Sequence, residues 1–154
     1  MDLPEVSHIG FIVNDIDKSV KRFGEIFNVE FNLYDFKPLC AWTYGEEIKD
    51  LYFRIGMATP ENGPGIEIIQ PVSGKAVRPL TFLETNGRNI HHLAYKVACE
   101  DYEGWKNYFI NKFAAEIVFE AEAEDDEIGY RRTFYTQMPD VSGLIEIATH
   151  PRKR

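Results

Sequence analysis

Apolar and polar residues alternate in two short segments that both begin with histidine and lie far apart in the chain. Residues 8–13 read His-Ile-Gly-Phe-Ile-Val, and residues 92–97 read His-Leu-Ala-Tyr-Lys-Val. A period of two is typical of β-strands with one apolar face. Because the two segments match loosely but stay in phase, they indicate an internal repeat.

A helical pattern follows each of these predicted strands. Asp15 or Asp17 precedes the first pattern and Asp101 precedes the second, and aspartate is a favoured residue at a helix N-terminus. Apolar residues then recur at helical spacing, namely Val20, Phe23, Ile26 and Phe27 in the first half and Trp105, Tyr108, Phe109 and Phe113 in the second. Each half therefore begins with a strand and then a helix.

Segments of β-type composition complete both halves. They span residues 30–35, 39–44, 51–57 and 65–70 in the first half and 116–121, 130–137 and 143–149 in the second. The last segment of each half carries a second match, Gly-Ile-Glu-Ile against Leu-Ile-Glu-Ile. Both halves approximate to βαβββ. We therefore predict an α+β fold in which two paired βαβββ modules form a curved mixed sheet with helices on its outer face.

The length of 154 residues suits a single domain, because neither half alone would bury a large core. Module one covers about residues 5–72 and module two about residues 88–150. The joint at 71–89 is interpreted as a linker with one helical turn, since it combines Pro, Ser, Gly and Lys with a short apolar stretch. The acidic run from Glu120 to Glu127 is interpreted as a solvated hairpin tip.

Strand alternation places four polar residues on the sheet face away from the helices. In the first strand Ile9 and Phe11 share one face while His8 lies on the other. The same alternation separates three further residues from their apolar neighbours, and these are Glu67, His92 and Glu146. A curved sheet would bring the four together. Two imidazoles and two carboxylates suit a divalent ion such as Zn, Ni, Co, Mn or Fe in a site open to water or substrate.

The internal repeat is the main reason to predict that these four residues are metal ligands. A single histidine or glutamate in a strand is more often a surface or core residue than a metal ligand. Here the same residue type recurs at the same place in both halves, which chance substitution gives no reason to expect. His91 serves as a comparison, because alternation puts it on the face opposite His92, and we assign it to packing or a hydrogen bond.

These residues resemble the vicinal oxygen chelate superfamily, which contains glyoxalase I, methylmalonyl-CoA epimerase, extradiol dioxygenases and bleomycin-resistance proteins. The resemblance covers nearly the whole chain and is carried by residues 8–13, 65–71, 90–97 and 143–147. From Gly65 to Ala94 it looks most like the glyoxalase and epimerase branch. It implies paired βαβββ modules and a substrate whose adjacent oxygens bind a metal, with the metal held by His8, Glu67, His92 and Glu146.

The sequence also departs from members of this superfamily. Epimerases of this type use a second carboxylate base on the strand before the first metal glutamate, and a rough alignment puts Arg54 there. This argues against a strict two-base epimerase unless Glu46 or Glu47 reaches the site. A second glutamate at position 67 argues against an Fe(II) dioxygenase, which uses two His and one Glu. The full ligand set argues against a metal-free binding or resistance protein, so both remain alternatives of lower rank.

The resemblance implies an isomerase or lyase that abstracts a proton next to a metal-bound carbonyl, as in glyoxalase I or methylmalonyl-CoA epimerase. Glu146 is the predicted base and Glu67 the alternative. Because guanidinium groups bind carboxylate or phosphate in a bidentate way, Arg54 is the predicted contact for an anionic substrate. The other cations considered for this role are Lys75, Arg78, Arg131 and Arg132.

Charge and composition limit the partners. The formal charge of -8 opposes nucleic-acid phosphates, so no nucleic-acid partner is expected. No apolar run approaches the roughly 20 residues that span a membrane. The two cysteines are poor evidence for disulfides, and the N-terminal residues lack the features of a signal peptide, so we expect a cytoplasmic protein. Sheet edges and the family resemblance favour a homodimer.

Overall fold

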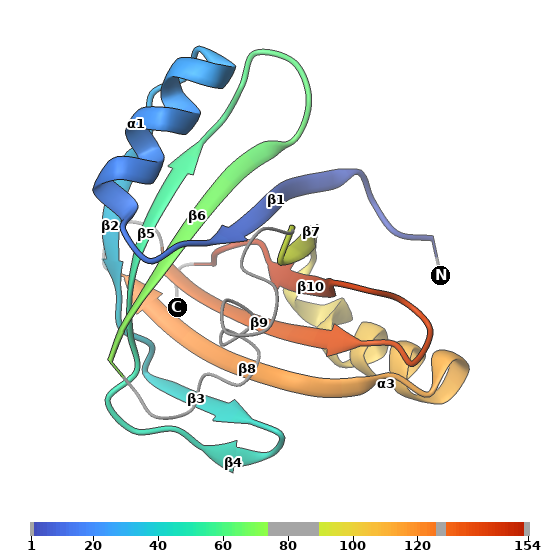
Figure 1. Ribbon diagram of the computed structural model, residues 1–154. Coiled ribbons are helices and arrows are strands. Elements are labelled where there is room, and N and C mark those ends of the chain that lie inside the picture. The colour runs from blue at the N-terminus through green and yellow to red at the C-terminus, as the bar shows by residue number, and fades with distance from the viewer. Residues whose placement is uncertain (1, 74–89, 126–128, 153–154) are drawn as a thin grey trace.

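A single mixed sheet forms the body of the protein. The structure is a computed structural model that describes residues 2–73, 90–125 and 129–152. Ten strands lie in the order β2-β5-β6-β1-β7-β10-β9-β8-β3-β4, and the sheet curves into a half-barrel (Figure 1). The strands are β1 (Val6–Ile12), β2 (Asn32–Phe36), β3 (Cys40–Thr43), β4 (Glu46–Glu47), β5 (Tyr52–Ala58), β6 (Gly65–Ser73), β7 (His92–Val97), β8 (Glu116–Asp125), β9 (Gly129–Gln137) and β10 (Leu144–Thr149).

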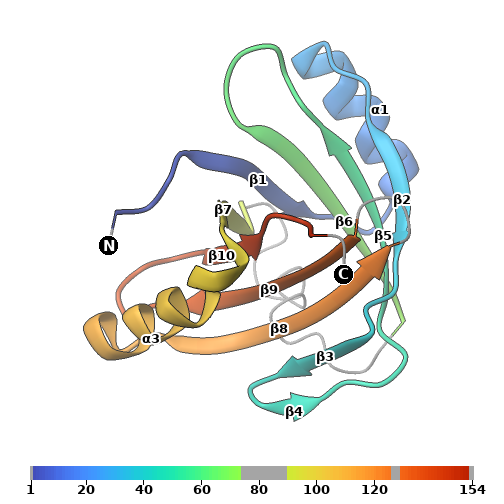
Figure 2. The same cartoon turned by 180° about the vertical axis from the view of Figure 1, so that it is seen from behind.

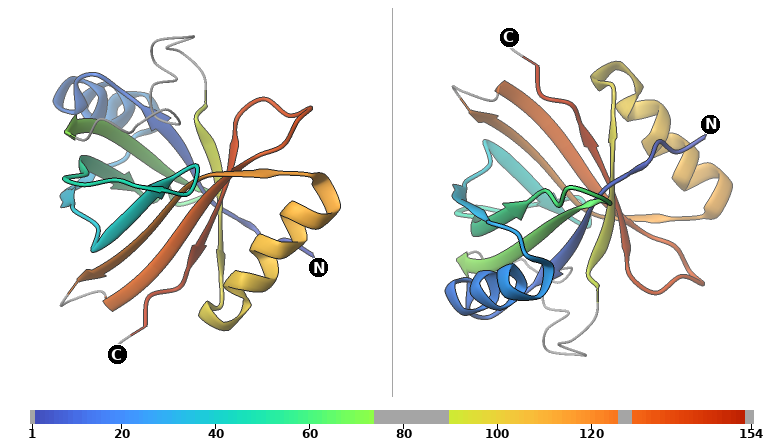
Figure 3. Two further views of the ribbon diagram at one scale, coloured as in Figure 1. Left: turned by 90° about the horizontal axis from the view of Figure 1, so that it is seen from below. Right: turned by 90° about the horizontal axis from the view of Figure 1, so that it is seen from above.

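The internal repeat predicted from the sequence organises this sheet. In the first half the order β1-β6-β5-β2 corresponds to β7-β10-β9-β8 in the second. Strand β1 runs parallel to β6, and β7 runs parallel to β10. The two halves meet where β1 and β7 pair in antiparallel fashion. Viewed from below and above, the halves flare away from this central pair (Figure 3). The α+β prediction is confirmed.

Within the described ranges, two α-helices cover the outer face of the sheet, one on each half (Figure 2). Helix α1 (Ile16–Phe27) packs on β5 and β6, where Ile16 is fully buried against Ile66 and Ile68. Helix α3 (Tyr102–Phe113) follows the short 3-10 helix η1 (Cys99–Asp101) and packs on β9 and β10. Its buried residues Tyr102, Trp105 and Phe109 contact Phe134 and Ile147. No helix in the described part of the chain is long and apolar enough to cross a membrane.

The structure shows which of the two candidate aspartates, Asp15 or Asp17, caps helix α1. The side chain of Asp15 accepts a hydrogen bond from the backbone N–H of Lys18 at 3.1 Å, as an N-cap residue does. Asp17 instead lies in the first turn. Asn28 ends the helix in the left-handed region at φ 52°, which asparagine tolerates better than most residues. Local sequence therefore fixes both ends of α1.

The hairpin of β3 and β4 departs from a plain βαβββ module. It leaves the first half between β2 and β5 and pairs with β8 of the second half, with Ala41 opposite Ala121. The short strand β4 was not predicted. The segment also supplies Ala41, Ile48 and Leu51 to a core cluster that includes Phe53 and Phe119. Both halves therefore contribute to one apolar cluster.

Two interpretations from the sequence concern the connections. Residues 74–89 of the proposed linker lie outside the described residues, as do residues 126 and 127 of the acidic run. The part of that run up to Asp125 belongs to β8, so its interpretation as a hairpin tip is wrong for these residues. Glu120 pairs with Lys106 at 2.6 Å, and Glu122 lies 3.4 Å from Arg132. These ion pairs connect β8 to α3 and β9.

Candidate metal centre

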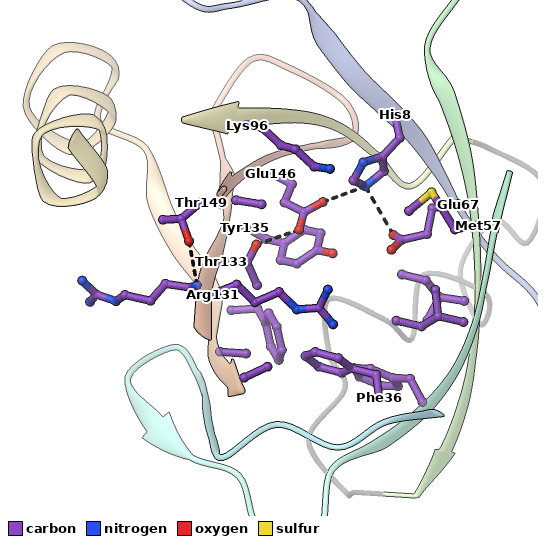
Figure 4. A pocket seen from close by; sticks show the side chains of 18 of the residues that line it. His8, Phe36, Met57, Glu67, Lys96, Arg131, Thr133, Tyr135, Glu146 and Thr149 are labelled. Atoms are coloured by element: carbon purple, nitrogen blue, oxygen red, sulfur yellow. Dashed lines mark hydrogen bonds and ion pairs between the residues drawn. The ribbon is translucent and has the colours of Figure 1, made fainter. Parts of the chain in front are cut away.

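Four polar residues meet on the concave face of the sheet, where β6, β1, β7 and β10 lie side by side. One ligand atom from each residue lies within 4.8 Å of the others, and all four residues are buried. Three of them converge in Figure 4, which shows His8 between the two carboxylates. The residues are His8, Glu67, His92 and Glu146, so the structure brings together the set expected from strand alternation.

The spacing of these atoms suits a bound divalent ion. Nε2 of His8 lies 3.5 Å from Oε2 of Glu67 and 3.1 Å from Oε2 of Glu146, and Nε2 of His92 lies 3.3 Å and 3.2 Å from the same oxygens. A tetrahedral ion with bonds of about 2.0–2.1 Å separates its ligands by about 3.3 Å. Each of these four atoms is buried and has no hydrogen-bond partner among the described residues. Such atoms are costly unless something binds them, so the residues fit a divalent metal.

The charges of the cluster are strongly coupled. Burial by itself would lower the pKa of His8, but the carboxylates of Glu67 and Glu146 outweigh it and raise this pKa to about 10. Burial would raise the pKa of Glu67, whereas His8 beside it lowers this pKa to about 2. Burial likewise opposes ionisation of Glu146, but His8 and His92 hold its pKa well below the usual value. A metal must therefore displace protons from the imidazoles.

Gly10 gives His92 its place in the cluster. Position 10 pairs with His92 across β1 and β7, and a Cβ atom on Gly10 would overlap the imidazole ring. The ring therefore occupies space that is left free because residue 10 is a glycine. Residues 8–13 were predicted to form a strand, but the sequence analysis did not predict that Gly10 makes room for His92. The glycine between two alternating apolar residues was the available signal.

His91 fixes the other side of the His92 ring. Its Nδ1 lies 2.8 Å from Nδ1 of His92, and its side chain is buried beside the cluster. A hydrogen bond at Nδ1 leaves Nε2 of His92 facing the other three residues. The sequence left packing or a hydrogen bond open for His91, and the structure shows a hydrogen bond, but the expectation that His91 lies on the face away from the cluster was wrong. Because β7 begins at His92, strand alternation does not extend to His91, which also lines the cavity.

Thr133 and Tyr135 of β9 complete the surroundings of Glu146. The hydroxyl of Thr133 donates to Oε1 of Glu146 at 2.7 Å, so that Oε2 faces the two histidines. The ring of Tyr135 packs edge-on against His92 with centroids 5.0 Å apart. Both residues were missed at the sequence level. Their alternate positions in the segment 130–137 gave a signal that became useful only with the strand order.

The cluster lies in a cavity with mainly apolar and aromatic walls. Its lining includes Tyr34, Phe36, Phe53, Ile55, Ile69 and Phe119. Among the described residues that line it, the carboxylates are Glu67 and Glu146. Lys96 and Arg131 add positive charge, and Figure 4 shows both side chains directed into this space. A small molecule bound here would be largely shielded from water.

Arg54 does not reach this cavity. Its guanidinium donates two hydrogen bonds to Asp17 of α1, at 3.0 and 2.9 Å. Arg54 alternates with Phe53 and Ile55, which face the cavity, so strand geometry directs it to the helix side. Glu46 and Glu47 are exposed on β4 and are not among the described lining residues. Lys75 and Arg78 lie outside the described residues.

Comparison with known proteins identifies similar sequences and folds. The sequence profile of the glyoxalase/bleomycin resistance protein/dioxygenase superfamily matches residues 7–107. No curated protein matches the sequence. Methylmalonyl-CoA epimerase from Mycobacterium tuberculosis is 17% identical with a TM-score of 0.66, covering 97% of this chain and 89% of that one.

Two Streptomyces coelicolor structures extend the comparison. A methylmalonyl-CoA epimerase variant in complex with 2-nitronate-propionyl-CoA is 17% identical with a TM-score of 0.63, covering 98% of this chain and 100% of that one. A 4-hydroxymandelate synthase mutant is 12% identical with a TM-score of 0.54, covering 99% of this chain and 49% of that one. At these identities the structural likeness concerns the fold alone.

Proposed function

Because this chain belongs to the glyoxalase/bleomycin resistance protein/dioxygenase superfamily, we propose that it is a divalent-metal-dependent isomerase or lyase that abstracts a proton next to a carbonyl group. One observation carries the proposal. Four buried ligand atoms, without hydrogen-bond partners, face one another at 3.1–3.5 Å in an apolar cavity. The proposed ligands are His8, Glu67, His92 and Glu146.

A bound divalent ion would act as a Lewis acid that stabilises the charge developing on the substrate oxygen. Glu146 is the proposed base. Its Oε1 accepts a hydrogen bond from Thr133 while Oε2 faces the cluster, so one oxygen is held in place and the other would be available to a substrate bound at the cluster. Glu67 is the alternative base from the other half of the sheet. The apolar walls exclude water, which strengthens these electrostatic contacts.

Among the described residues, the cavity lining contains one pair of carboxylates, Glu67 and Glu146. Both lie in the metal cluster, and Arg54, Glu46 and Glu47 lie outside the cavity lining. An epimerase that uses a separate second base therefore finds no support among the described residues. Glyoxalase-like chemistry, in which the cluster carboxylates themselves move the proton, is favoured over it. We propose methylglyoxal hemithioacetals as the first substrates to test and methylmalonyl-CoA as the second.

The test follows proton transfer in metal-loaded protein. Conversion of the hemithioacetal and incorporation of solvent deuterium into methylmalonyl-CoA are measured for the wild type and Glu146→Gln. The variant is expected to retain metal, because its amide oxygen still faces the cluster, and to lose turnover by about 100-fold or more, the scale of a general base. Retained turnover in Glu146→Gln would remove this residue from the role of base.

If neither substrate is converted but oxygen is consumed when catechols are supplied, the dioxygenase alternative is favoured. Absence of any turnover, together with equally tight ligand binding by metal-free and metal-loaded protein, would favour a binding protein. Each result therefore separates the proposed lyase or isomerase from one other class in the same superfamily.

A further inference from the structure

Arg131 extends from β9 into the cavity on the side away from the metal cluster. Figure 4 shows its side chain between Phe36 and the group formed by His8, Glu67 and Glu146. The guanidinium carbon lies 5.6 Å from the centroid of the Phe36 ring, which gives a cation–π contact. Burial raises the pKa of Tyr34, and Arg131 opposes this rise, so the guanidinium lies near the Tyr34 phenol.

Arg131 differs from the neighbouring arginines in its charge partners. Arg54 pairs with Asp17, and Arg132 pairs with Glu103 at 2.7 Å and Glu122 at 3.4 Å. No carboxylate in the described ranges lies within ion-pair distance of Arg131. A partly buried guanidinium in apolar surroundings is costly when it lacks an anion. The surroundings of Arg131 within the described ranges therefore favour the binding of an anion.

Space for such an anion lies beside the guanidinium. Position 131 pairs with Ala123 across β8 and β9, and both Ala121 and Ala123 line the cavity with small side chains. The cavity wall also carries large apolar side chains, with Ile55, Ile69 and Phe119 among them. A guanidinium binds a carboxylate through two parallel hydrogen bonds. The cavity thus offers two polar ends joined by an apolar middle.

We propose that Arg131 binds a carboxylate of the substrate that is separate from the oxygen atoms facing the metal cluster. The substrate class is then a small carboxylic acid with an apolar segment between its carboxylate and its reacting carbonyl. This inference rests on the proposed function, because it takes the cluster of His8, Glu67, His92 and Glu146 as the place where the reacting oxygens bind.

The test uses synthetic chelators as probes. Monohydroxamates of aliphatic dicarboxylic acids of increasing length present two adjacent oxygens at one end and a carboxylate at the other, and their terminal amides serve as neutral partners. Calorimetry measures binding to zinc-loaded and to chelator-treated protein. The carboxylate probe of optimal length is expected to bind about tenfold or more tightly than its amide, the scale of a charge-assisted hydrogen bond.

Matched variants test whether Arg131 causes the preference for the carboxylate probe over its amide. R131Q is expected to abolish the carboxylate preference and R131K to retain part of it, because lysine keeps the charge but not the bidentate geometry. R132Q removes the guanidinium of the adjacent arginine, which also lines the cavity but is already paired with Glu103 and Glu122, and it is expected to keep the full preference. Circular dichroism confirms that each variant is folded.

The outcomes separate this inference from the proposed function. Equal binding of carboxylate and amide probes by the wild type, or a preference that persists in R131Q, would overturn the role of Arg131. A preference that is present with and without zinc and disappears in R131Q would support it. If zinc raises the affinity of neither probe, that result counts against the metal-dependent function. The role of Arg131 is then decided separately, by the preference for carboxylate over amide in the wild type and in R131Q.

Discussion

The imidazole of His92 occupies the space that a side chain at position 10 would need. We therefore expect Gly10→Ala to displace this ring and weaken metal binding by about tenfold or more, the scale seen when the support of a metal ligand is lost. Metal titration followed by calorimetry measures the affinity. Gly56→Ala is the control, since its Cβ would crowd Val20 and Leu33 near α1, far from the ligand atoms. Equal metal affinity of Gly10→Ala and wild type would contradict this account.

Thr133 acts through Glu146 as a positioning residue. Thr133→Val keeps the shape of the side chain but removes the hydrogen bond to Oε1, so Glu146 loses its fixed orientation. We expect kcat to fall by about tenfold, the cost of one such hydrogen bond, while metal content stays unchanged. Thr133→Ser should restore activity because it restores the donor. A variant that loses stability but keeps kcat would indicate a merely structural hydroxyl.

Proton binding competes with metal binding at His8. Its pKa of about 10 in the metal-free protein lies above the ordinary value, so His8 is protonated at neutral pH and must lose that proton to bind metal. Apparent metal affinity should therefore rise by about tenfold per pH unit for each proton displaced between about pH 6 and 8. Titration in buffers of different ionisation enthalpy counts the protons released. An affinity independent of pH would contradict the coupling.

The same shifts set the stability of the metal-free cluster. A raised histidine pKa contributes stability that is complete below pH 6.5 and is lost as the pH rises toward about 10. A depressed glutamate pKa contributes stability present above pH 4.5 and lost as the pH falls toward about 2. The cluster therefore stabilises the metal-free fold most in the weakly acidic range between these limits.

At the scale of elements, helix α1 depends on one of two acidic residues near its start. Asp15→Ala removes the acceptor for the N–H of Lys18 and should lower the free energy of unfolding measurably. Asp17→Ala leaves this cap intact and removes only the exposed pair with Arg54, so its effect should be smaller. Urea unfolding of both variants provides the comparison. The reverse order of stability would show that Asp17 is the important residue.

Local patterns predicted most elements but not their partners. Period-two alternation and capping residues indicated the strands and both helices, because these depend on nearby residues. The pairing of β3 with β8 was not predictable, since it joins distant segments through contacts that have no local signature. The short strand β4 exists only as a partner of β3.

The four polar residues were brought together as alternation predicted, because each lies in a regular strand and is followed by an apolar residue. Strand alternation alone did not predict which cationic side chain faces the cavity. Arg54 lies in a segment with apolar residues at both phases, and only the packing of α1 on β5 decides its direction. Arg131 and Arg132 are adjacent and both line the cavity, but Arg132 pairs with Glu103 and Glu122, partners that only the tertiary structure supplies.

At the scale of the whole molecule, the candidate metal centre lies at the joint between the two halves. His8 and Glu67 come from the first half and His92 and Glu146 from the second, on four adjacent strands. A bound ion would therefore link both halves and stabilise the folded chain as a whole. The shared core beneath β3 and β8 links the halves a second time. The site and the architecture thus depend on the same junction.

Metal analysis of purified protein tests this account most directly. Protein prepared without chelator or affinity tag is compared with Glu67→Ala/Glu146→Ala and with Glu46→Ala/Glu47→Ala, a control in which two exposed carboxylates are removed. The account predicts about one divalent ion per chain in the wild type and the control, and none in the cluster variant. Absence of metal from the wild type, or equal metal content in the cluster variant, would contradict it.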